Sequence, residues 1–354
     1  MKRQTLWRVV GVVLLALGIP LAMLVSAQVR RSHPSQKNDR GQAGEYRISG
    51  PYIHRNLTIF LIHGKERSAS RNTLTLEEAL KQKKVIVYET KDVNELAIRN
   101  LSQTEDIFVQ SGDIVKGGQQ DRTIGVDLIV PPNSGRIKLA AFCVENGRWE
   151  KRGNEVSSQF SSSSSRVATR DIKLAVVREG SQSQVWAKVA EAQDKLSNNV
   201  GTRVNSSQSE SSLQLTLENK QVQETADSYI KALGKIIAGQ PDVIGYAFAI
   251  NGQVNSADVY ASNALFRKLW PRLLEASAVE AIAELQPGQP KAAPVPLDRV
   301  ESFIDDAEGG KATGKDVTTR IQSVTRETKE NILLETRDRA RSGAWIHKTY
   351  IKKD

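Results

Sequence analysis

The sequence predicts an α+β protein built mainly of antiparallel strands, as a sandwich or barrel-like sheet, with helices in its second half and a C-terminal β meander. Three observations predict this class. Short β-rich runs separated by polar or Gly/Pro turns fill residues 46–144, as in antiparallel sheets. No helical pattern alternates with those runs, which argues against a Rossmann-like parallel sheet. Helical periodicity then dominates residues 185–305, and three strand-like runs follow it.

The first 27 residues have the pattern of a secretory signal. Three basic residues open the chain, namely Lys2, Arg3 and Arg8. Residues 9–27 are almost wholly apolar and end in Val-Ser-Ala, with small residues where a signal peptidase reads. Residues 6–27 are also long enough for a retained membrane anchor. Both interpretations place the body outside the cytoplasm, secreted, periplasmic or anchored, and the polar residues 28–45 are expected to be a flexible linker.

Charge and cysteine content limit the classes of function. Cys143 is the only cysteine, so no intrachain disulfide can form. The formal net charge is +10, and residues 309–354 hold eleven Lys/Arg against six Asp/Glu. Such a segment can attract nucleic acid or anionic lipid. Its basic residues alternate with acidic ones, as on a solvated sheet face, so we do not expect a nucleic-acid partner.

In the first half, a capping box at Thr75–Glu78 predicts a short helix through Lys81. The serine-rich residues 157–165 are expected to form an exposed loop. Strands are predicted at residues 57–62, 85–88, 95–98, 106–109, 123–130 and 137–144.

In the second half, Asn251-Gly252 between two strand-like runs predicts a type I′ hairpin over residues 243–260. A helix is expected after Ser262, with a kink at Pro271 or a break before it. The proline-rich residues 286–296 read as a linker or surface loop. Further helices are predicted at residues 185–196, 218–237 and 297–305, and strands at 317–325, 331–336 and 344–351. We therefore expect one globular domain over residues 46–305. The meander of residues 306–354 either completes its sheet or forms a separate unit.

Two polar patches are candidate binding sites. The first, Ser111 to Arg122, crowds charged and amide side chains around Gly117-Gly118 between two strands, where loops commonly carry binding groups. The second, Cys143 to Trp149, ends a strand. The alternatives are a solvated glycine turn for the first and a buried core end for the second. The candidate ligand-binding residues are Asp113, Lys116, Gln120, Asp121, Arg122, Glu145, Arg148 and Trp149.

The two patches are expected to meet. Arg122 and Glu145 are joined by one hairpin-like unit that turns at residues 131–135, so its far ends lie side by side. This places Asp121 and Arg122 beside Glu145 and Arg148. An Arg–carboxylate fork there would be either a structural ion pair or a binding group for a polar or anionic ligand.

The same residues carry a family resemblance. Residues 112–122 (GDIVKGGQQDR) and 143–149 (CVENGRW), with the 243–260 hairpin and residues 265–274 (LFRKLWPRLL), resemble the ARG and rhodanese/phosphatase-superfamily-associated domain family. The resemblance covers about residues 46–305. It implies a shared fold unit and, through the family's association with other domains, a partner- or ligand-sensing role. It implies no catalytic residues.

Other chemistries lack support. Residues 309–316 read G-x-x-x-x-G-K, but Asp316 replaces the Mg²⁺-binding Ser/Thr of a P-loop. The four histidines are scattered without metal-ligand spacing, and we expect neither a metal nor another cofactor. No G-x-S-x-G elbow is present. A dyad of Cys143 with His54 or His63 is geometrically possible, without support from the sequence.

The expected function is therefore that of an exported domain that binds a small ligand or a protein, without catalysis. The alternative is an extracytoplasmic hydrolase that uses Asp113, Asp121, Arg122 and Glu145. A pocket with two carboxylates of separated pKa values would favour the hydrolase. A shallow apolar patch rimmed by polar groups would favour the binding domain.

Overall fold

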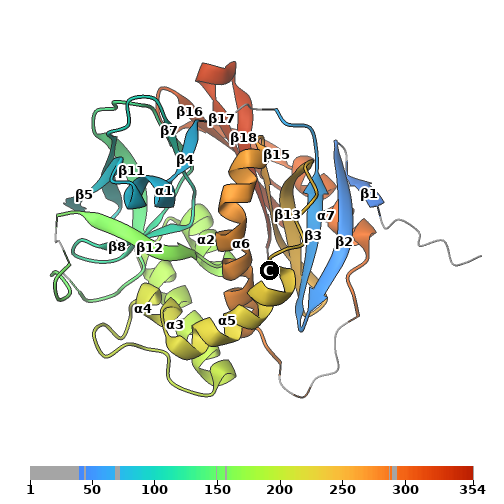
Figure 1. The fold of residues 1–354 in the computed structure, drawn as a ribbon, viewed down its shortest axis with the longest axis horizontal. Helices are drawn as coiled ribbons and strands as arrows, with labels where there is room; N and C mark the ends of the chain where they lie inside the picture. Colours follow the sequence, from blue (N-terminus) through green and yellow to red (C-terminus); the bar gives the residue numbers. More distant parts are fainter. Residues whose placement is uncertain are drawn as a thin grey trace, which may run out of the picture. The chain divides into compact units, whose positions relative to one another are not determined.

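The computed structural model describes residues 40–43, 45–67, 72–148, 150–155, 158–286, 288 and 293–353. The predicted signal or anchor lies outside these residues. Within them, no helix is both long enough and apolar enough to cross a membrane. Figure 1 shows two sheet regions with a long helix, α6 (Asn263–Ala283), between them.

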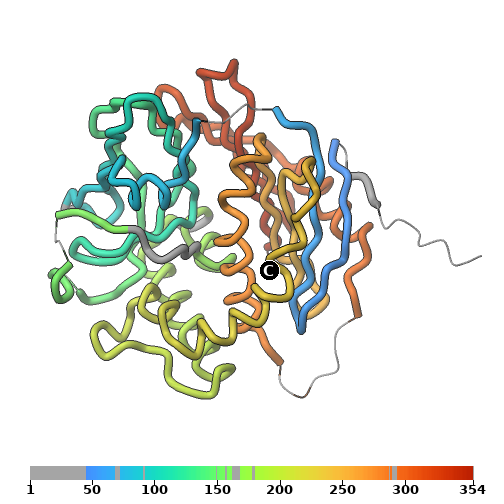
Figure 2. The backbone as a smooth tube through the Cα atoms, in the orientation of Figure 1, coloured from blue at the N-terminus to red at the C-terminus, as the bar shows by residue number. Residues whose placement is uncertain are grey.

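The larger sheet has nine strands in the order β1-β2-β3-β13-β14-β18-β17-β16-β15. Every neighbouring pair in it is antiparallel, and the C-terminal meander forms one of its edges. Figure 2 shows how it brings the N-terminal strands beside the 243–260 hairpin. Its strands are β1 (Arg40–Ala43), β2 (Tyr46–His54), β3 (Leu57–His63), β13 (Val243–Ile250), β14 (Gln253–Tyr260), β15 (Lys311–Asp316), β16 (Ile321–Glu327), β17 (Asn331–Asp338) and β18 (Ala344–Lys352).

Two smaller sheets form the other region. A six-stranded sheet has the order β12-β8-β9-β11-β6-β5, and a three-stranded sheet has the order β10-β7-β4. Among the described pairs, only β4 with β7 is parallel. Their strands are β4 (Thr73–Thr75), β5 (Val85–Asp92), β6 (Glu95–Asn100), β7 (Asp106–Val109), β8 (Asp113–Gly117), β9 (Arg122–Ile124), β10 (Leu128–Val130), β11 (Ile137–Cys143) and β12 (Phe160–Val167).

The helices cover both faces of the large sheet. Helix α6 packs against β13 on one face and β12 of the smaller sheet on the other side, which joins the two regions in one core. Helix α7 packs on the opposite face, against β1, β2 and β17. The central strand β3 is consequently buried along its whole length. The remaining helices are α1 (Leu76–Lys81), α2 (Arg170–Leu174) with a π turn (Ala175–Glu179), α3 (Gln182–Val200), α4 (Leu213–Leu217) and α5 (Lys220–Leu233); α7 spans Leu297–Glu308.

Two predictions that depend on neighbouring residues, the capping box and the hairpin turn, are confirmed. Thr75 and Glu78 form both halves of the capping box at α1. Asn251 and Gly252 have φ values of 50° and 77°, as a type I′ turn requires. The predicted α+β class, with mainly antiparallel sheets and a C-terminal meander, is confirmed as well.

Two expectations are wrong, and one is narrowed. The serine-rich residues 157–165 were expected to loop out, but Phe160–Val167 form β12, an edge strand whose backbone pairs with β8. An edge strand needs backbone partners and no apolar alternation, which explains the missing signal. Of the two alternatives expected at Pro271, a kink or a break, the break is not formed, because helix α6 continues through this residue. The predicted strand of residues 123–130 is two strands, β9 and β10, in different sheets.

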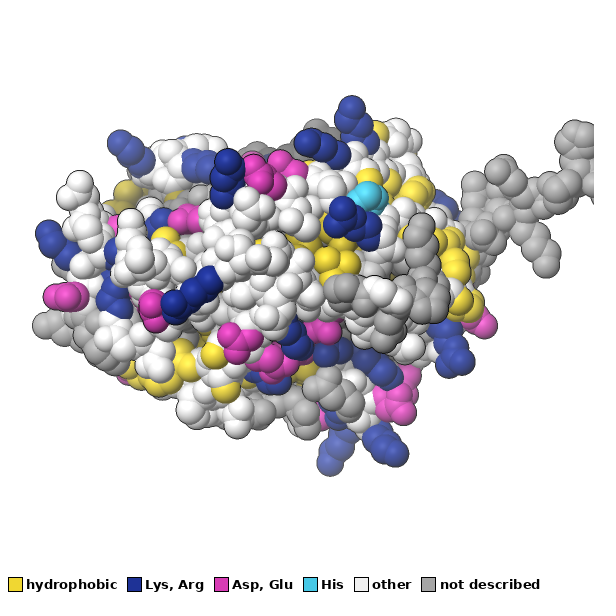
Figure 3. All heavy atoms as spheres, turned by 90° about the horizontal axis from the view of Figure 1, so that it is seen from below, with side chains coloured by type: hydrophobic (Ala, Val, Ile, Leu, Met, Phe, Trp, Pro, Cys, Tyr) yellow, Lys and Arg dark blue, Asp and Glu magenta, His cyan; other side chains and the backbone are white. Residues whose placement is uncertain are grey.

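Charges are mixed over the surface. On the face shown in Figure 3, Lys and Arg side chains are spread among Asp and Glu side chains. Within the basic C-terminal segment, Lys352 pairs with Glu330 at 2.5 Å and Lys353 with Glu327 at 2.7 Å. The segment therefore neutralises part of its own excess charge.

Candidate functional site

The two sequence patches meet at one end of the six-stranded sheet. Cys143, the last residue of β11, pairs with Arg122, the first residue of β9. The pairing continues beyond the strands, because the Val144 amide donates to the Asp121 carbonyl at 3.0 Å. The Asp121 amide in turn donates to Glu145 Oε2 at 3.0 Å. The backbone thus places Asp121 directly beside Glu145.

The glycine pair before Asp121 makes this approach possible. Gly117 and Gly118 have φ values of 119° and 58°, in the region that favours glycine. A Cβ on Gly118 would lie 2.4 Å from the ring of Phe160, so a larger residue would also clash. The Gly117 amide donates to Asp121 Oδ1 at 3.0 Å. The turn therefore both reverses the chain and orients the Asp121 carboxylate.

Two arginines complete a buried ion cluster, defined here as Asp121, Glu145, Arg148 and Arg152. Arg148 Nε donates to Glu145 Oε1 at 2.7 Å, and Arg152 Nη1 donates to Asp121 Oδ2 at 3.1 Å. A cross-link joins the two pairs, since Arg152 Nη1 also lies 3.3 Å from Glu145 Oε1. Both carboxylates are fully buried. The cluster is a closed network in which each charge faces an opposite one.

The pKa values of the Asp121 and Glu145 carboxyl groups are shifted in opposite directions. Burial, and then the charge of Glu145, raise the pKa of Asp121 above its ordinary value. Burial also acts to raise the pKa of Glu145, but hydrogen bonds from Arg148, Ser209 and the Asp121 amide outweigh it and lower that pKa. This arrangement satisfies the electrostatic half of the expectation for a hydrolase.

A second loop is tied to the cluster from α4. Ser212 is the N-cap of α4, and its hydroxyl donates to Asp121 Oδ2 at 2.8 Å. Next to it, Ser211 Oγ donates to the Asn146 carbonyl at 2.6 Å and accepts from the Asn146 amide at 2.9 Å. These bonds hold residues 208–212 opposite residues 146–155.

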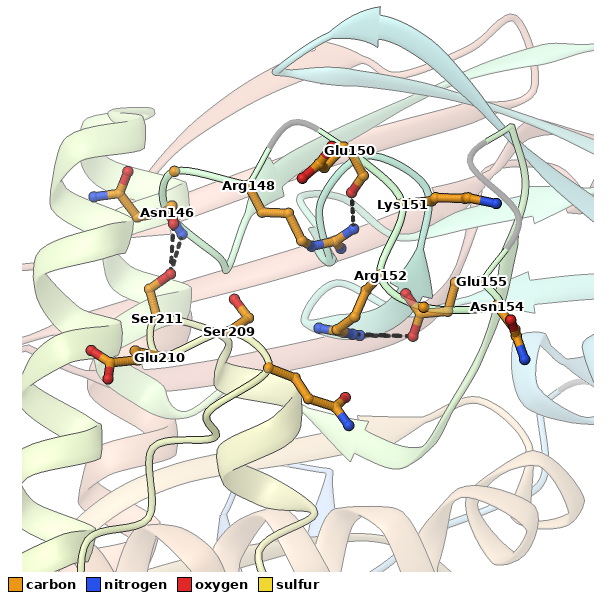
Figure 4. Close-up of a pocket in the computed structure, with 13 residues that line it drawn as sticks. Asn146, Arg148, Glu150, Lys151, Arg152, Asn154, Glu155, Ser209, Glu210 and Ser211 are labelled. Carbon is orange, nitrogen blue, oxygen red and sulfur yellow. Dashed lines mark hydrogen bonds and ion pairs between the residues drawn. The ribbon is translucent and has the colours of Figure 1, made fainter.

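A pocket of about 890 Å³ lies between these two loops; we call it the loop pocket. Figure 4 shows Arg148 and Arg152 extending between the loops, with Asn146 and Ser211 at one side and Asn154 and Glu155 at the other. Its described lining residues are all polar or glycine: Asn146, Gly147, Arg148, Glu150, Lys151, Arg152, Gly153, Asn154, Glu155, Gln208, Ser209, Glu210 and Ser211. The apolar patch expected of a binding domain is not what lines this pocket.

The residues of this site fall inside a recognised family domain. The model of the ARG and Rhodanese-Phosphatase-superfamily-associated Protein domain, ARPP-1, matches residues 45–351. The chain belongs to the ARPP-1 family. No curated protein and no solved structure matches the sequence. The match extends past residue 305, so the ARPP-1 domain includes the C-terminal meander.

The other predicted site residues of the ARPP-1 domain lie away from the pocket. Arg122 is buried and faces Glu89, at 3.6 Å, and Gln120, whose Oε1 accepts from Arg122 Nη1 at 3.2 Å. The Arg–carboxylate fork expected at this place is formed by Arg148 with Glu145 and by Arg152 with Asp121, and Arg122 is not part of it. Asp113 pairs with Arg272 of α6 in the core. Lys116 pairs with Glu218 at 2.8 Å. Trp149 lies outside the described residues.

Cys143 is a buried structural residue. Its backbone amide donates to Gln182 Oε1 at 2.8 Å. Burial raises the pKa of the thiol to about 11. His63 bonds Ser49 and Asp242 instead of the thiol. The Cys–His dyad is thus not formed with His63. Within the described residues, no three His, Cys, Asp or Glu side chains form a group that could hold a metal ion.

Sequence reasoning missed Arg152 and Ser212. Arg152 stands in the run Arg148–Arg152 among charged residues that resemble a solvated loop. Ser212 ends a polar stretch 60 residues later in the chain and reaches Arg152 Nη1 at 3.4 Å. The available signal was the N-cap position of Ser212 before the apolar residues of α4.

Proposed function

We propose that the ARPP-1 domain of this chain is an exported binding module whose loop pocket takes a neutral, polyhydroxylated ligand such as an oligosaccharide. The composition of the pocket carries this proposal. Its lining mixes three cationic residues, Arg148, Lys151 and Arg152, with three anionic ones, Glu150, Glu155 and Glu210, and Arg148 and Arg152 also pair with the buried Glu145 and Asp121. A lining of mixed charge does not present the single positive or negative surface that would select a charged ligand. It offers both donors and acceptors, which suits hydroxyl groups because they do both.

The position of the ion cluster supports a binding function better than a catalytic one. Neither Asp121 nor Glu145 belongs to the pocket lining, and both are fully buried beneath Arg148 and Arg152. Every nitrogen of the Arg152 guanidinium donates to protein oxygen, with Glu155 Oε1 accepting from Nε at 3.3 Å and from Nη2 at 2.9 Å. A general acid or base must come within hydrogen-bond reach of the reacting atoms. The cluster instead serves as a rigid floor for the pocket.

The rim supplies the groups that would select the ligand. Asn154 and Gln208 are exposed on opposite loops, and no hydrogen bond of either side-chain amide is found among the described residues. Amide side chains pair well with sugar hydroxyls, since each amide has donors and an acceptor. The pocket volume falls within the usual range of small-molecule sites, about 300–1,000 Å³.

The double variant Asn154→Ala, Gln208→Ala is expected to weaken oligosaccharide binding at least tenfold. Both changes remove rim hydrogen bonds and leave the ion cluster intact. Isothermal titration of the full chain with a panel of neutral and charged oligosaccharides measures this. Gln223→Ala, an exposed amide on α5, is the matched control and should bind like the parent. Preference for charged members of the panel, or no binding to any member, would contradict the proposal.

Export is the second element of the proposal. Lys2, Arg3 and Arg8, the apolar residues 9–27 and the Val-Ser-Ala end support it. A reporter that is active only outside the cytoplasm, fused after Gln28, is expected to be active. The control replaces two apolar residues, Leu14 and Leu15, by Arg, which should abolish the signal. A fusion active only as a cytoplasmic reporter would show that the segment does not export.

A further inference from the structure

A serine, a histidine and an aspartate form a hydrogen-bonded chain on the large sheet, separate from the loop pocket. Ser49 Oγ lies 2.7 Å from His63 Nε2, and His63 Nδ1 lies 2.9 Å from Asp242 Oδ1. Ser49 is on β2, His63 ends β3, and Asp242 directly precedes β13. These strands are at the right of Figure 1, whereas α4 and β11, which border the loop pocket, are at the left.

The hydrogen bonds fix the direction of proton transfer. A carboxylate only accepts hydrogen bonds, so in the neutral imidazole Nδ1 carries the proton and its N–H donates a hydrogen bond to Asp242. His63 Nε2 then accepts from the Ser49 hydroxyl. Arg47 Nη2 donates to the other Asp242 oxygen at 2.6 Å and holds that carboxylate in place. The nucleophile, the base and the group that orients the base are therefore in the order that an activated serine requires.

The backbone around His63 is shaped for this alignment. The β2–β3 register shifts directly after Ser49, and the β3–β13 register shifts directly after Val243. A glycine lies within each irregular segment. Gly50 has φ of 123°, and a Cβ on Gly245 would lie 2.3 Å from the Asp258 carbonyl oxygen. Bulges commonly re-aim side chains beside active sites.

The three groups differ in exposure. His63 is buried at 3%, whereas Ser49 is half-buried and the Asp242 side chain is 49% exposed. The serine is thus partly accessible, and its base is buried in the sheet. This geometry does not depend on the loop pocket or on what that pocket binds.

We propose that Ser49, His63 and Asp242 form a nucleophilic site that hydrolyses acyl esters. Ser49 Oγ bonds to the acyl carbon as the bond from that carbon to the alcohol oxygen breaks. The hydroxyl proton passes to His63 Nε2 and then to the departing alcohol. Water next gives a proton to His63 and its oxygen bonds to the acyl carbon. Ser49 regains the proton as the carboxylic acid leaves. Asp242 orients the imidazole and stabilises its charged form.

An ester is the substrate class that this site fits. Solvent screens the half-exposed Asp242 and weakens its support of the imidazolium. A base supported in this way suits an ester, whose alcohol leaves more readily than the amine of an amide. The partial exposure of Ser49 favours an acyl group presented at the surface of a larger molecule.

The test is labelling of the full chain with a fluorophosphonate probe, in which serine oxygen displaces fluoride from phosphorus. Peptide mass spectrometry is expected to place the label on Ser49. Ser49→Ala should lose it. Asp242→Asn, a change at an exposed side chain, should slow labelling at least tenfold with an unchanged melting temperature. Hydrolysis of p-nitrophenyl acetate should fall in parallel in both variants.

Ser161→Ala is the matched control, since Ser161 is an exposed strand serine whose hydroxyl donates to the Lys116 carbonyl. It should label like the parent. Absence of label on Ser49, or labelling of Asp242→Asn at the parent rate, overturns the proposal and leaves the chain of hydrogen bonds as a structural link between strands. Because the loop pocket is untouched by these variants, this failure is distinct from failure of oligosaccharide binding.

Discussion

Replacing Arg152 with alanine is expected to lower the free energy of unfolding by about 3–5 kcal/mol, because the change leaves buried carboxylate charge uncompensated. Arg152 contacts Asp121 through two nitrogens, at 3.1 and 3.2 Å, and reaches Glu145 at 3.3 Å. Arg148 remains as a partner, but its nearest approach to Asp121 is 3.6 Å. Urea denaturation at pH 7 measures the difference.

The matched control is Arg203→Ala. Arg203 pairs with Glu210 at 3.1 Å, and the two side chains are 67% and 69% exposed. Exposed pairs contribute about 0–1 kcal/mol, so this variant should stay within that range. The double variant Arg152→Ala, Asp121→Ala should recover part of the loss, since it removes one of the stranded charges. Equal effects of the two arginine substitutions would show that the cluster is not energetically special.

The Arg152→Ala variant also tests whether Arg152 only supports the loop pocket or contacts the ligand directly. If Arg152 acts only by stabilising the fold, the affinity of the loop pocket for its ligand should fall in proportion to the loss of stability. Oligosaccharide affinity that disappears in a variant of parental stability would instead give Arg152 a direct contact with the ligand.

The convergence of the two patches followed from the sequence because it depends on local rules. A hairpin-like unit returns its ends to one place, and this put Asp121 beside Glu145. The capping box at Thr75 and the Asn251-Gly252 turn were predictable for the same reason. The capping box and the turn depend on residues within a few positions of one another, and the convergence depends on one hairpin-like unit whose ends are 24 positions apart.

Which side chains pair with which could not be predicted from the sequence. The alternation of a strand does not determine which of several arginines reaches a carboxylate, and Arg122 turned to Glu89. Ser212 and Arg152 meet across 60 residues of intervening chain. Likewise, Ser49 of β2, His63 of β3 and Asp242, which directly precedes β13, are brought together only by the sheet order. Tertiary placement of this kind leaves no short-range pattern in one sequence.

A second buried cluster predicts a strong dependence of stability on pH. His347 of β18 is fully buried between two aspartates, with Nδ1 2.7 Å from Asp127 Oδ2 and Nε2 3.1 Å from Asp258 Oδ1. The Tyr260 ring stacks on the imidazole at 4.3 Å. Burial alone would lower the pKa of His347, but the charge of Asp127 and the hydrogen bonds to Asp127 and Asp258 outweigh it. They raise the pKa to about 9.

The free energy of unfolding is therefore expected to fall by about 3 kcal/mol between pH 6.5 and pH 9. Below pH 6.5 the folded and unfolded chains both hold the His347 proton, and the full stabilisation is present. As pH rises, the unfolded chain releases the proton first, so folding becomes less favourable by about 1.4 kcal/mol per pH unit. The loss is complete once pH exceeds the folded pKa of about 9. Urea denaturation at half-unit steps from pH 6 to pH 9 measures this slope.

The His347→Gln variant should lose most of this slope, because no ionisable ring remains between Asp127 and Asp258. Its absolute stability is expected to be lower at pH 6.5, where the parent imidazolium compensates both carboxylates, so the comparison depends on the slope and not on one value. His54→Gln is the matched control: burial and Arg55 lower the pKa of His54, so this residue cannot produce a loss at alkaline pH. A parental slope in His347→Gln would show that another group titrates here. A flat profile in the parent would show that the fold does not raise the pKa of His347.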